Sequence, residues 1–273
     1  MAEGVSARFD ALNRHKTIRE IDIKSSAGKA EIVELVRDAD VFLHNWAEGK
    51  GEEMQLGASN LQAVNPSLIY AHAAGWATDN TEHTLLGTDF VTQAYSGVAQ
   101  QISQQSGKRG GSLFTVLDVL GGVVAAQGIT AALLERQLNN QRIQVKSSLM
   151  SAATLLCAKP LQQIYSPDAN QLKQSSPING VYATQQGLIA IECVDEASVT
   201  RLFDAIDTAV SSEQLAETLL SKTATEWLVI FQAANIPAAV VVEDLTDLMN
   251  NPLLQPCLTT SSYTQVISPW SFL

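Results

Sequence analysis

Apolar positions in the first half of the chain switch between helical and strand-like spacing. Residues 32–36 carry a helical stripe, and the short apolar runs 41–44 and 67–73 are typical of buried strands. A short helix is predicted over 61–64, and the alternation of isoleucine with charge over 21–23 predicts a further strand. Strands that alternate with helices indicate a parallel sheet, and hence an α/β fold.

Parallel sheets bind their ligands beyond the carboxyl ends of their strands. In this chain those positions are the segments His44–Trp46 and Ala74–Trp76, which directly follow two of the predicted strands. Both segments are therefore candidate binding loops.

A second helical pattern begins at Asp89 and runs to about Ser103, with Asp89 as a predicted N-cap carboxylate. A polar loop over 104–112 separates it from a long apolar helix that ends near Asn139. The apolar stretch Phe114–Leu134 contains an aspartate, a glutamine and three glycines, which predicts a closely packed core helix rather than a membrane span.

The pattern changes after this helix, which predicts a second domain of mixed α+β type. An antiparallel hairpin is expected around Gly187, and Thr223 and Glu226 have capping-box spacing. The predicted helices and strand are 196–207, 212–220, 223–234, the strand 236–242 and a short helix over 243–249. The expected organisation is a large domain over 1–155, a small domain over 156–250 and a return linker over 251–273.

Composition narrows the class of protein. The chain is 46% hydrophobic and 16% charged, which fits a packed globular protein. A formal net charge of −11 argues against a general nucleic-acid binder, because phosphate backbones require concentrated positive charge. The first residues lack the positive start and apolar centre of a signal peptide. We therefore expect a cytoplasmic protein without a nucleic-acid or membrane partner.

Neither a disulfide framework nor a metal site is indicated. Three distant cysteines never adopt CxxC spacing, and four histidines show no ligand spacing, so each histidine is expected to be structural or on the surface. These residues are Cys157, Cys193, Cys257, His15, His44, His72 and His83. HExxH, GxSxG and GxGxxG motifs are absent as well, which removes the enzyme classes that depend on them.

Asp89 is the strongest candidate for covalent chemistry. Gly87 precedes it and an apolar helix follows, so its carboxylate lies at the positive end of a predicted helix. A carboxylate in that position either caps the helix or acts as a nucleophile, and local sequence alone leaves both roles open.

Ordered motifs along nearly the whole chain resemble the class III CoA-transferases, the CaiB/BaiF family. LNRHKTIREIDIKS at 12–25 resembles the family's LNRNKRSVALDLKS, and ADVFLHNW at 39–46 resembles ADVVVENF. NPSLIYAHAAGW at 65–76 is similar to NPRLIYCSISGF, and GTDFVTQAYSG at 87–97 to GYDLIAQAMSG. The likeness continues through 117–136, 179–191 and 225–241.

The resemblance implies a fold, a reaction and a site. The fold is a Rossmann-like domain with a smaller α+β domain in an interlocked homodimer, here without the family's amino-terminal strand–helix–strand unit and its carboxy-terminal end. The reaction transfers coenzyme A (CoA) from an acyl-CoA to a small carboxylate through a thioester on Asp89, with no permanently bound cofactor. Lys16, Asn45 and Trp46 are expected near CoA, and the strand-exit residues Gly75 and Trp76 complete the predicted binding set.

Departures from the family pattern leave alternatives open. The related racemases carry a histidine where this chain has Thr88, which disfavours racemisation and suggests that Asp118 is structural. Basic family positions hold Ala47, Glu53 and Leu85, which weakens phosphate binding; Lys50, Lys108 and Arg109 either replace them or belong to solvated loops. The alternatives are a catalytically silent relative, or one half of a split enzyme whose second chain supplies the missing strands.

Overall fold

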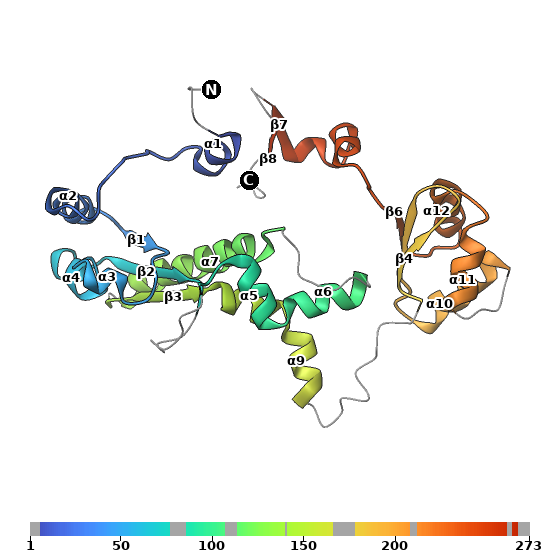
Figure 1. Ribbon diagram of the computed structural model, residues 1–273, viewed down its shortest axis with the longest axis horizontal. Coiled ribbons are helices and arrows are strands. Elements are labelled where there is room, and N and C mark those ends of the chain that lie inside the picture. Colours follow the sequence, from blue (N-terminus) through green and yellow to red (C-terminus); the bar gives the residue numbers. More distant parts are fainter. Residues whose placement is uncertain are drawn as a thin grey trace. The chain divides into compact units, whose positions relative to one another are not determined.

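A computed structural model describes residues 6–76, 86–106, 114–139, 141–165, 178–207, 212–260 and 264–266. The chain divides into two units, one formed by Arg19–Ala169 and the other by Met1–Ile18 together with Asn170–Leu273 (Figure 1). Each unit has a hydrophobic core of its own. The predicted domain limits at 155 and 250 stay a prediction.

The unit Arg19–Ala169 is built around a parallel three-stranded sheet in the order β1-β2-β3. Val41 pairs with Ile69, and Tyr70 pairs with Gln144. This confirms the predicted α/β architecture. Its elements are α2 (Ser26–Val36), β1 (Val41–His44), α3 (Lys50–Glu53), α4 (Ala58–Val64), β2 (Ile69–Ala74), α5 (Asp89–Ser96), α6 (Val98–Ser106), α7 (Val116–Asn139), β3 (Gln144–Ser148), α8 (Leu149–Leu156) and α9 (Ala158–Tyr165).

Helices pack on both faces of this sheet. Tyr70 packs with Ile32 and Leu61 on the face covered by α2 and α4. Val145 points to the opposite face, where a Cβ atom placed on Gly128 of α7 would lie 3.0 Å from the Val145 side chain. A side chain at Gly128 would therefore require the Val145 side chain to shift.

Two predicted elements were wrong. Residues 21–23 form no strand and lie in the segment that leads to α2. The helix that starts at Asp89 ends at Ser96, because Gly97 adopts a left-handed backbone with φ 87°, and α6 then begins at Val98. The predicted loop over 104–112 lies mostly outside the described residues.

Helix α7 is long and apolar enough to span a membrane, by length and composition alone. One side packs on β2, β3, α5 and α8, as a core helix does. The other side leaves large apolar side chains exposed in the single chain. These are Val119, Val123, Leu134 and Leu138.

The second unit has an antiparallel sheet, β4-β5-β6, covered on one face by helices, which confirms its α+β character (Figure 1). Gly187 turns the β4–β5 hairpin with φ 81°, and Thr223 and Glu226 form the predicted capping box. Its elements are α1 (Ala7–Asn13), β4 (Gly180–Ala183), β5 (Leu188–Ile191), α10 (Glu196–Ile206), α11 (Ser212–Leu219), α12 (Ala224–Ala233), β6 (Ala238–Val240), the 3-10 helices η1 (Leu245–Asn250) and η2 (Gln255–Cys257), β7 (Leu258–Thr260) and β8 (Thr264–Val266).

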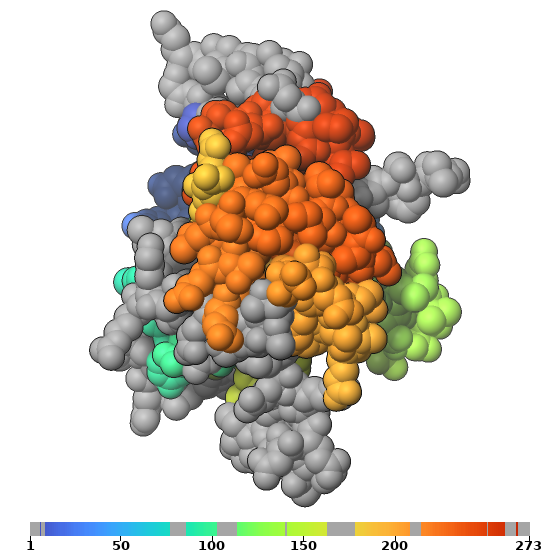
Figure 2. All heavy atoms as spheres, turned by 90° about the vertical axis from the view of Figure 1, so that its right-hand side faces the viewer, coloured from blue at the N-terminus to red at the C-terminus, as the bar shows by residue number. Residues whose placement is uncertain are grey.

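The helical layer of this unit is amphipathic. Leu202, Leu215 and Phe231 turn inward and are fully buried in the core beneath the sheet. Figure 2 shows the outer surface of the unit in orange, where the helices present their remaining side chains.

Candidate active site

Asp89 is the first residue of α5, and its carboxylate points away from that helix's own amides. Thr88 is the N-cap residue, with an extended backbone and no side-chain capping bond. The prediction that Asp89 caps its own helix is therefore wrong. The side chain is buried, with 7% of its surface exposed.

The Asp89 carboxylate instead accepts hydrogen bonds from a backbone amide of α7 and from a side-chain amide one turn further along α5. The backbone N–H of Asp118, in the first turn of α7, donates to Oδ2 at 2.7 Å. The side-chain amide of Gln93, one turn further along α5, donates to Oδ1 through Nε2. The same Nε2 lies 3.2 Å from the carbonyl oxygen of Phe114, just before α7.

These donors fix the orientation of the carboxylate, and they place it at the amino end of the 24-residue helix α7. Each carboxylate oxygen has two lone pairs, so one hydrogen bond per oxygen leaves a lone pair for attack. The arrangement is therefore that of an oriented nucleophile.

Two glycines bring the end of β2 against the start of α5. A Cβ atom on Gly75 would lie 2.4 Å from Cα of Gly87, so neither residue can carry a side chain without moving backbone. The carbonyl oxygen of Gly75 also accepts a hydrogen bond from the N–H of Met150 at 3.2 Å. This contact places Asp89 at the carboxyl end of a parallel strand, where α/β proteins bind ligands.

Trp76 joins this group of residues. Its indole packs edge-on against the ring of Tyr95 in α5, with the centroids 5.1 Å apart. The structure therefore brings Gly75, Trp76 and Asp89 together, and we call this group with Gln93 and the Asp118 amide the Asp89 site. The sequence singled out Asp89, Gly75 and Trp76 but missed Gln93, whose spacing of four residues from Asp89 on a helix was the available signal.

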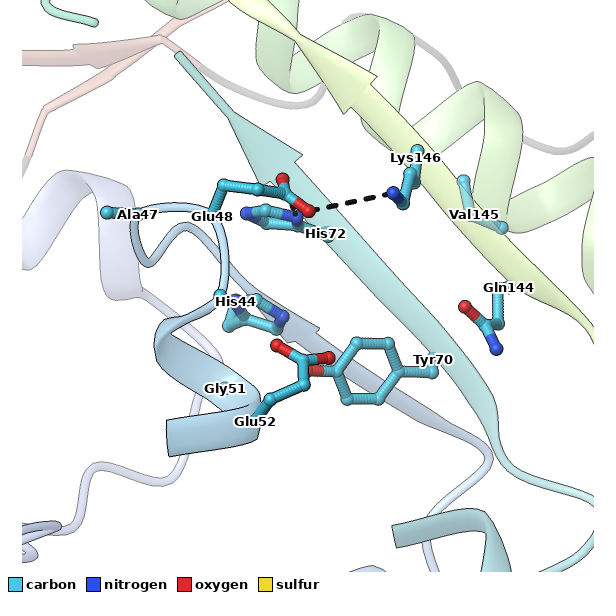
Figure 3. A pocket seen from close by; sticks show the side chains of 11 residues that line it. His44, Ala47, Glu48, Gly51, Glu52, Tyr70, His72, Gln144, Val145 and Lys146 are labelled. Atoms are coloured by element: carbon cyan, nitrogen blue, oxygen red, sulfur yellow. Dashed lines mark ion pairs between the residues drawn. The ribbon is translucent and has the colours of Figure 1, made fainter. Parts of the chain in front are cut away.

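The other predicted strand-exit residues follow β1, next to His44, which belongs to a second polar cluster; Figure 3 shows His44 in that cluster with His72 and Glu48. Asn45 is exposed after β1, and Trp46 stacks near His44 with ring centroids 4.6 Å apart. His44 and His72 line a cavity of about 100 Å³. Other residues that line it include Glu48, Glu52, Tyr70 and Lys146. We call it the histidine cavity.

His72 contacts acceptors through both ring nitrogens. Its Nε2 donates to the carbonyl oxygen of Trp46 at 2.7 Å, and its Nδ1 lies 3.5 Å from a Glu48 carboxylate oxygen. These contacts fix the orientation of the ring. Glu48 also lies 3.6 Å from the ammonium of Lys146.

His44 is the opposite case. It stacks on His72 with ring centroids 4.4 Å apart and 17° between the planes. Burial, together with the neighbouring His72 charge, lowers the pKa of His44 from 6.5 to about 4. Because its Nδ1 accepts from the N–H of Trp46, the proton is on Nε2, a buried atom without a hydrogen-bond partner in the structure.

Tyr70 forms the apolar end of the histidine cavity. Its hydroxyl donates to the carbonyl oxygen of Leu56 at 3.2 Å. Burial raises the pKa of Tyr70 to about 12, with Glu52 and Glu48 adding to the effect. The expectation that His44 and His72 are structural does not foresee this cavity, although they lie directly opposite each other on β1 and β2.

The cations suggested by the sequence lie elsewhere. Lys16 belongs to the other unit, where its ammonium donates to the carbonyl oxygen of Leu12 at 2.8 Å. Lys50 pairs with Glu53 at 2.7 Å on the surface. Lys108 and Arg109 lie outside the described residues. Among the residues that the structure describes, no group of histidine, cysteine and carboxylate side chains has the arrangement to hold a metal ion.

Comparison with known sequences gives one family. Residues 1–259 match the family model described as CoA-transferase family III. A probable fatty acyl-CoA transferase of Mycobacterium tuberculosis, Rv3272, is 25% identical over 84% of this chain and 66% of its own length. Human succinyl-CoA:glutarate CoA-transferase is 23% identical over 85% of this chain and 58% of its own length. Human alpha-methylacyl-CoA racemase is 26% identical over 84% of this chain and 66% of its own length. The chain thus spans less than two thirds of the length of these relatives.

Solved structures show the same fold. A crystal structure of Rv3272 superimposes with a TM-score of 0.82 and 25% identity, covering 96% of this chain and 78% of that one. A CaiB/BaiF family protein from Brucella suis gives a TM-score of 0.78 at 19% identity, covering 98% and 78%.

Proposed function

Because the chain belongs to CoA-transferase family III, we propose that it transfers CoA from an acyl-CoA to a small carboxylate, with Asp89 as the nucleophile. One observation supports this assignment above all others. The Asp89 carboxylate is buried and is oriented by the Asp118 amide and by Gln93, at the carboxyl end of β2.

The proposed reaction proceeds through covalent intermediates on Asp89. A carboxylate oxygen attacks the thioester carbonyl carbon of the donor, and the C–S bond breaks to release CoA thiolate and form a mixed anhydride. The thiolate attacks the aspartyl carbonyl of that anhydride, which releases the donor acid and leaves an aspartyl-CoA thioester. An acceptor carboxylate then repeats the two steps in reverse and departs as the new acyl-CoA. Each exchange replaces one activated acyl group by another of similar energy.

The binding residues in this proposal are those that the sequence suggested. Trp76 and Gly75 border Asp89, while Asn45 and Trp46 follow the neighbouring strand. We propose that they contact CoA; the role of Lys16, which belongs to the other unit, stays a prediction from the sequence. CoA is a substrate here, and the proposal includes no permanently bound cofactor.

Transfer is favoured over racemisation. A racemase exchanges a proton beside the thioester and needs a general base there. Thr88 immediately precedes Asp89, and its hydroxyl cannot serve as that base near neutral pH. Asp118 contributes its backbone N–H to the Asp89 site, which supports a structural role.

Names of relatives suggest the substrates to test. They include succinyl-CoA:glutarate, acetyl-CoA:oxalate and succinyl-CoA:mesaconate CoA-transferases. We therefore propose a small carboxylate as acceptor, and a panel of these three donor–acceptor pairs.

Intact-mass analysis after exposure to each acyl-CoA tests the proposal. The wild-type chain should gain a CoA adduct. Hydroxylamine should displace the CoA and leave a hydroxamate on Asp89. Asp89→Ala and the isosteric Asp89→Asn should gain no adduct. If wild type forms no adduct and calorimetry detects no CoA binding, the transferase proposal fails. The chain is then a silent relative, or half of a split enzyme that a second chain completes.

We further propose that the protein acts as a cytoplasmic homodimer. The exposed apolar residues of α7, including Val123 and Leu134, offer a second copy an apolar face. Light scattering tests the oligomeric state, and a mass equal to a single chain would reject the dimer without touching the assignment of Asp89.

A further inference from the structure

We infer that the two oxygens of Asp89 have separate roles: Oδ1, held by Gln93, is the attacking atom, while Oδ2, held by the Asp118 amide, remains the carbonyl oxygen throughout the reaction. Gln93 is thus a positioning residue that selects one oxygen. The inference rests on the proposed function and adds an asymmetry that the reaction by itself does not require.

The asymmetry follows from the kind of donor that holds each oxygen. The Asp118 N–H is part of the backbone in the first turn of α7 and cannot turn away from Oδ2 at 2.7 Å. Gln93 donates from a side chain, and its Nε2 lies between two acceptors, Asp89 Oδ1 and the carbonyl oxygen of Phe114. One donor is fixed, and the other has a second partner already in place.

The two oxygens change in different ways during the reaction, so different donors suit them. When a carboxylate oxygen attacks a thioester, it becomes the bridging oxygen of an anhydride and accepts hydrogen bonds poorly. Gln93 Nε2 then keeps its bond to the Phe114 carbonyl, so the fully buried amide is not left without a partner. The N–H of Asp118 is fixed by the backbone at 2.7 Å from Oδ2, and it suits the oxygen that stays a carbonyl.

The Asp118 N–H also serves the second step. CoA thiolate attacks the aspartyl carbonyl carbon, and negative charge develops on Oδ2 in the tetrahedral intermediate. A backbone donor at the amino end of a long helix stabilises that charge. When the intermediate collapses, the bond from the aspartyl carbon to Oδ1 breaks, and Oδ1 leaves in the released acid.

Oxygen-18 labelling distinguishes selective from random use of the two oxygens. The experiment uses the donor–acceptor pair of the panel that wild type turns over. Both carboxylate oxygens of the acceptor are oxygen-18. In each complete turnover the attacking position of Asp89 is refilled by an acceptor oxygen. After many turnovers, mass spectrometry of the Asp89 peptide should show one labelled oxygen if Oδ1 alone attacks, and two if either oxygen attacks.

Variants of Gln93 test whether it makes the selection. Gln93→Leu removes the amide at similar size, so Asp89 should acquire label in both oxygens, and kcat should fall about tenfold to a hundredfold with an unchanged KM for acyl-CoA. Gln93→Glu repels the Asp89 carboxylate when ionised and donates when protonated. Its activity relative to wild type should therefore rise as the pH falls.

Thr92→Val is the matched control. Thr92 is the neighbouring residue of α5, is equally buried, and has a hydroxyl without a hydrogen-bond partner in the structure. Its replacement by an isosteric valine should change neither the label count nor kcat. Thermal melting of all variants shows which of them fold.

The outcomes separate the two proposals. Absence of any adduct in wild type, together with absence of CoA binding by calorimetry, rejects the proposed function. An active wild type that acquires label in both oxygens overturns the assignment of Oδ1. If wild type retains one unlabelled oxygen and folded Gln93→Leu does so too, Gln93 is not the selecting residue.

Discussion

The Asp89 site and the histidine cavity both lie where parallel strands end, yet they treat charge in opposite ways. At the Asp89 site, neutral amides hold a single carboxylate, so its negative charge is oriented but not cancelled. In the histidine cavity, Glu48 faces His72 and pairs with the ammonium of Lys146, so the charges of Glu48 and Lys146 offset one another. Neutral donors keep a charged group reactive, whereas paired charges serve mainly to stabilise local structure.

The backbone differs as well. At the Asp89 site, Gly75 is in direct contact with Gly87, and their approach leaves no space for a Cβ atom on either residue. Around the histidine cavity aromatic rings fill the space, with His44 between Trp46 and His72. The first region is therefore sensitive to added atoms, and the second to protonation. This contrast can be tested by substitution and by pH.

The largest effect is expected from Gly75→Ala. The new Cβ would meet Gly87 Cα at 2.4 Å, so the two loops must separate. We expect a loss of about 3 kcal/mol in the free energy of unfolding and loss of the Asp89 adduct. Denaturant titration and adduct mass measure both.

Gly122→Ala in α7 is the control for Gly75→Ala. No atom lies within 4 Å of a Cβ at this position, and alanine favours the helix by up to about 1 kcal/mol. Equal unfolding midpoints for the two variants would contradict the close approach of the two loops.

The second effect is a pH dependence that comes from His44. The unfolded chain takes up a proton at this residue near its ordinary pKa of 6.5, but the folded chain does so only near 4. Stability is therefore complete above pH 6.5 and falls as the pH drops through the window from 6.5 to about 4, by up to about 3 kcal/mol. Urea titrations across that window measure the loss.

His44→Phe keeps an aromatic ring and removes the titration, so it should flatten the pH dependence in the same window. His15→Asn is the matched control, because His15 is exposed and its left-handed backbone, φ 65°, suits asparagine. A wild-type slope in the His44→Phe variant would assign the pH effect to another group.

The smallest effect is expected from Glu48→Gln. It removes the charge that faces His72 and Lys146, but Glu48 is itself partly exposed, with 39% of its side chain accessible. We expect a loss of about 1 kcal/mol or less, which becomes smaller in high salt. Glu53→Gln breaks the exposed pair with Lys50 and provides the comparison; neither variant should alter the Asp89 adduct.

Local pattern was sufficient for most elements of the fold. The strands 41–44 and 69–74, helix α7 and the β4–β5 hairpin follow from apolar periodicity, glycine in a turn and capping residues. It was insufficient at 21–23, where two isoleucines alternate with charges but have no neighbouring strand to pair with. The helical pattern also continues past Gly97, but the helix ends there because Gly97 adopts a left-handed backbone conformation.

The sequence by itself determined the family, the parallel sheet and the identity of Asp89 as the candidate nucleophile, because these depend on motifs and on spacing along the chain. Only the tertiary structure decided what the Asp89 carboxylate contacts. Its donors come from Gln93 and from the amide of Asp118, which is 29 residues away in sequence. Periodicity reports which face a residue takes, but not which distant backbone group will meet it, because that depends on how α5, α7 and the glycine loops pack together.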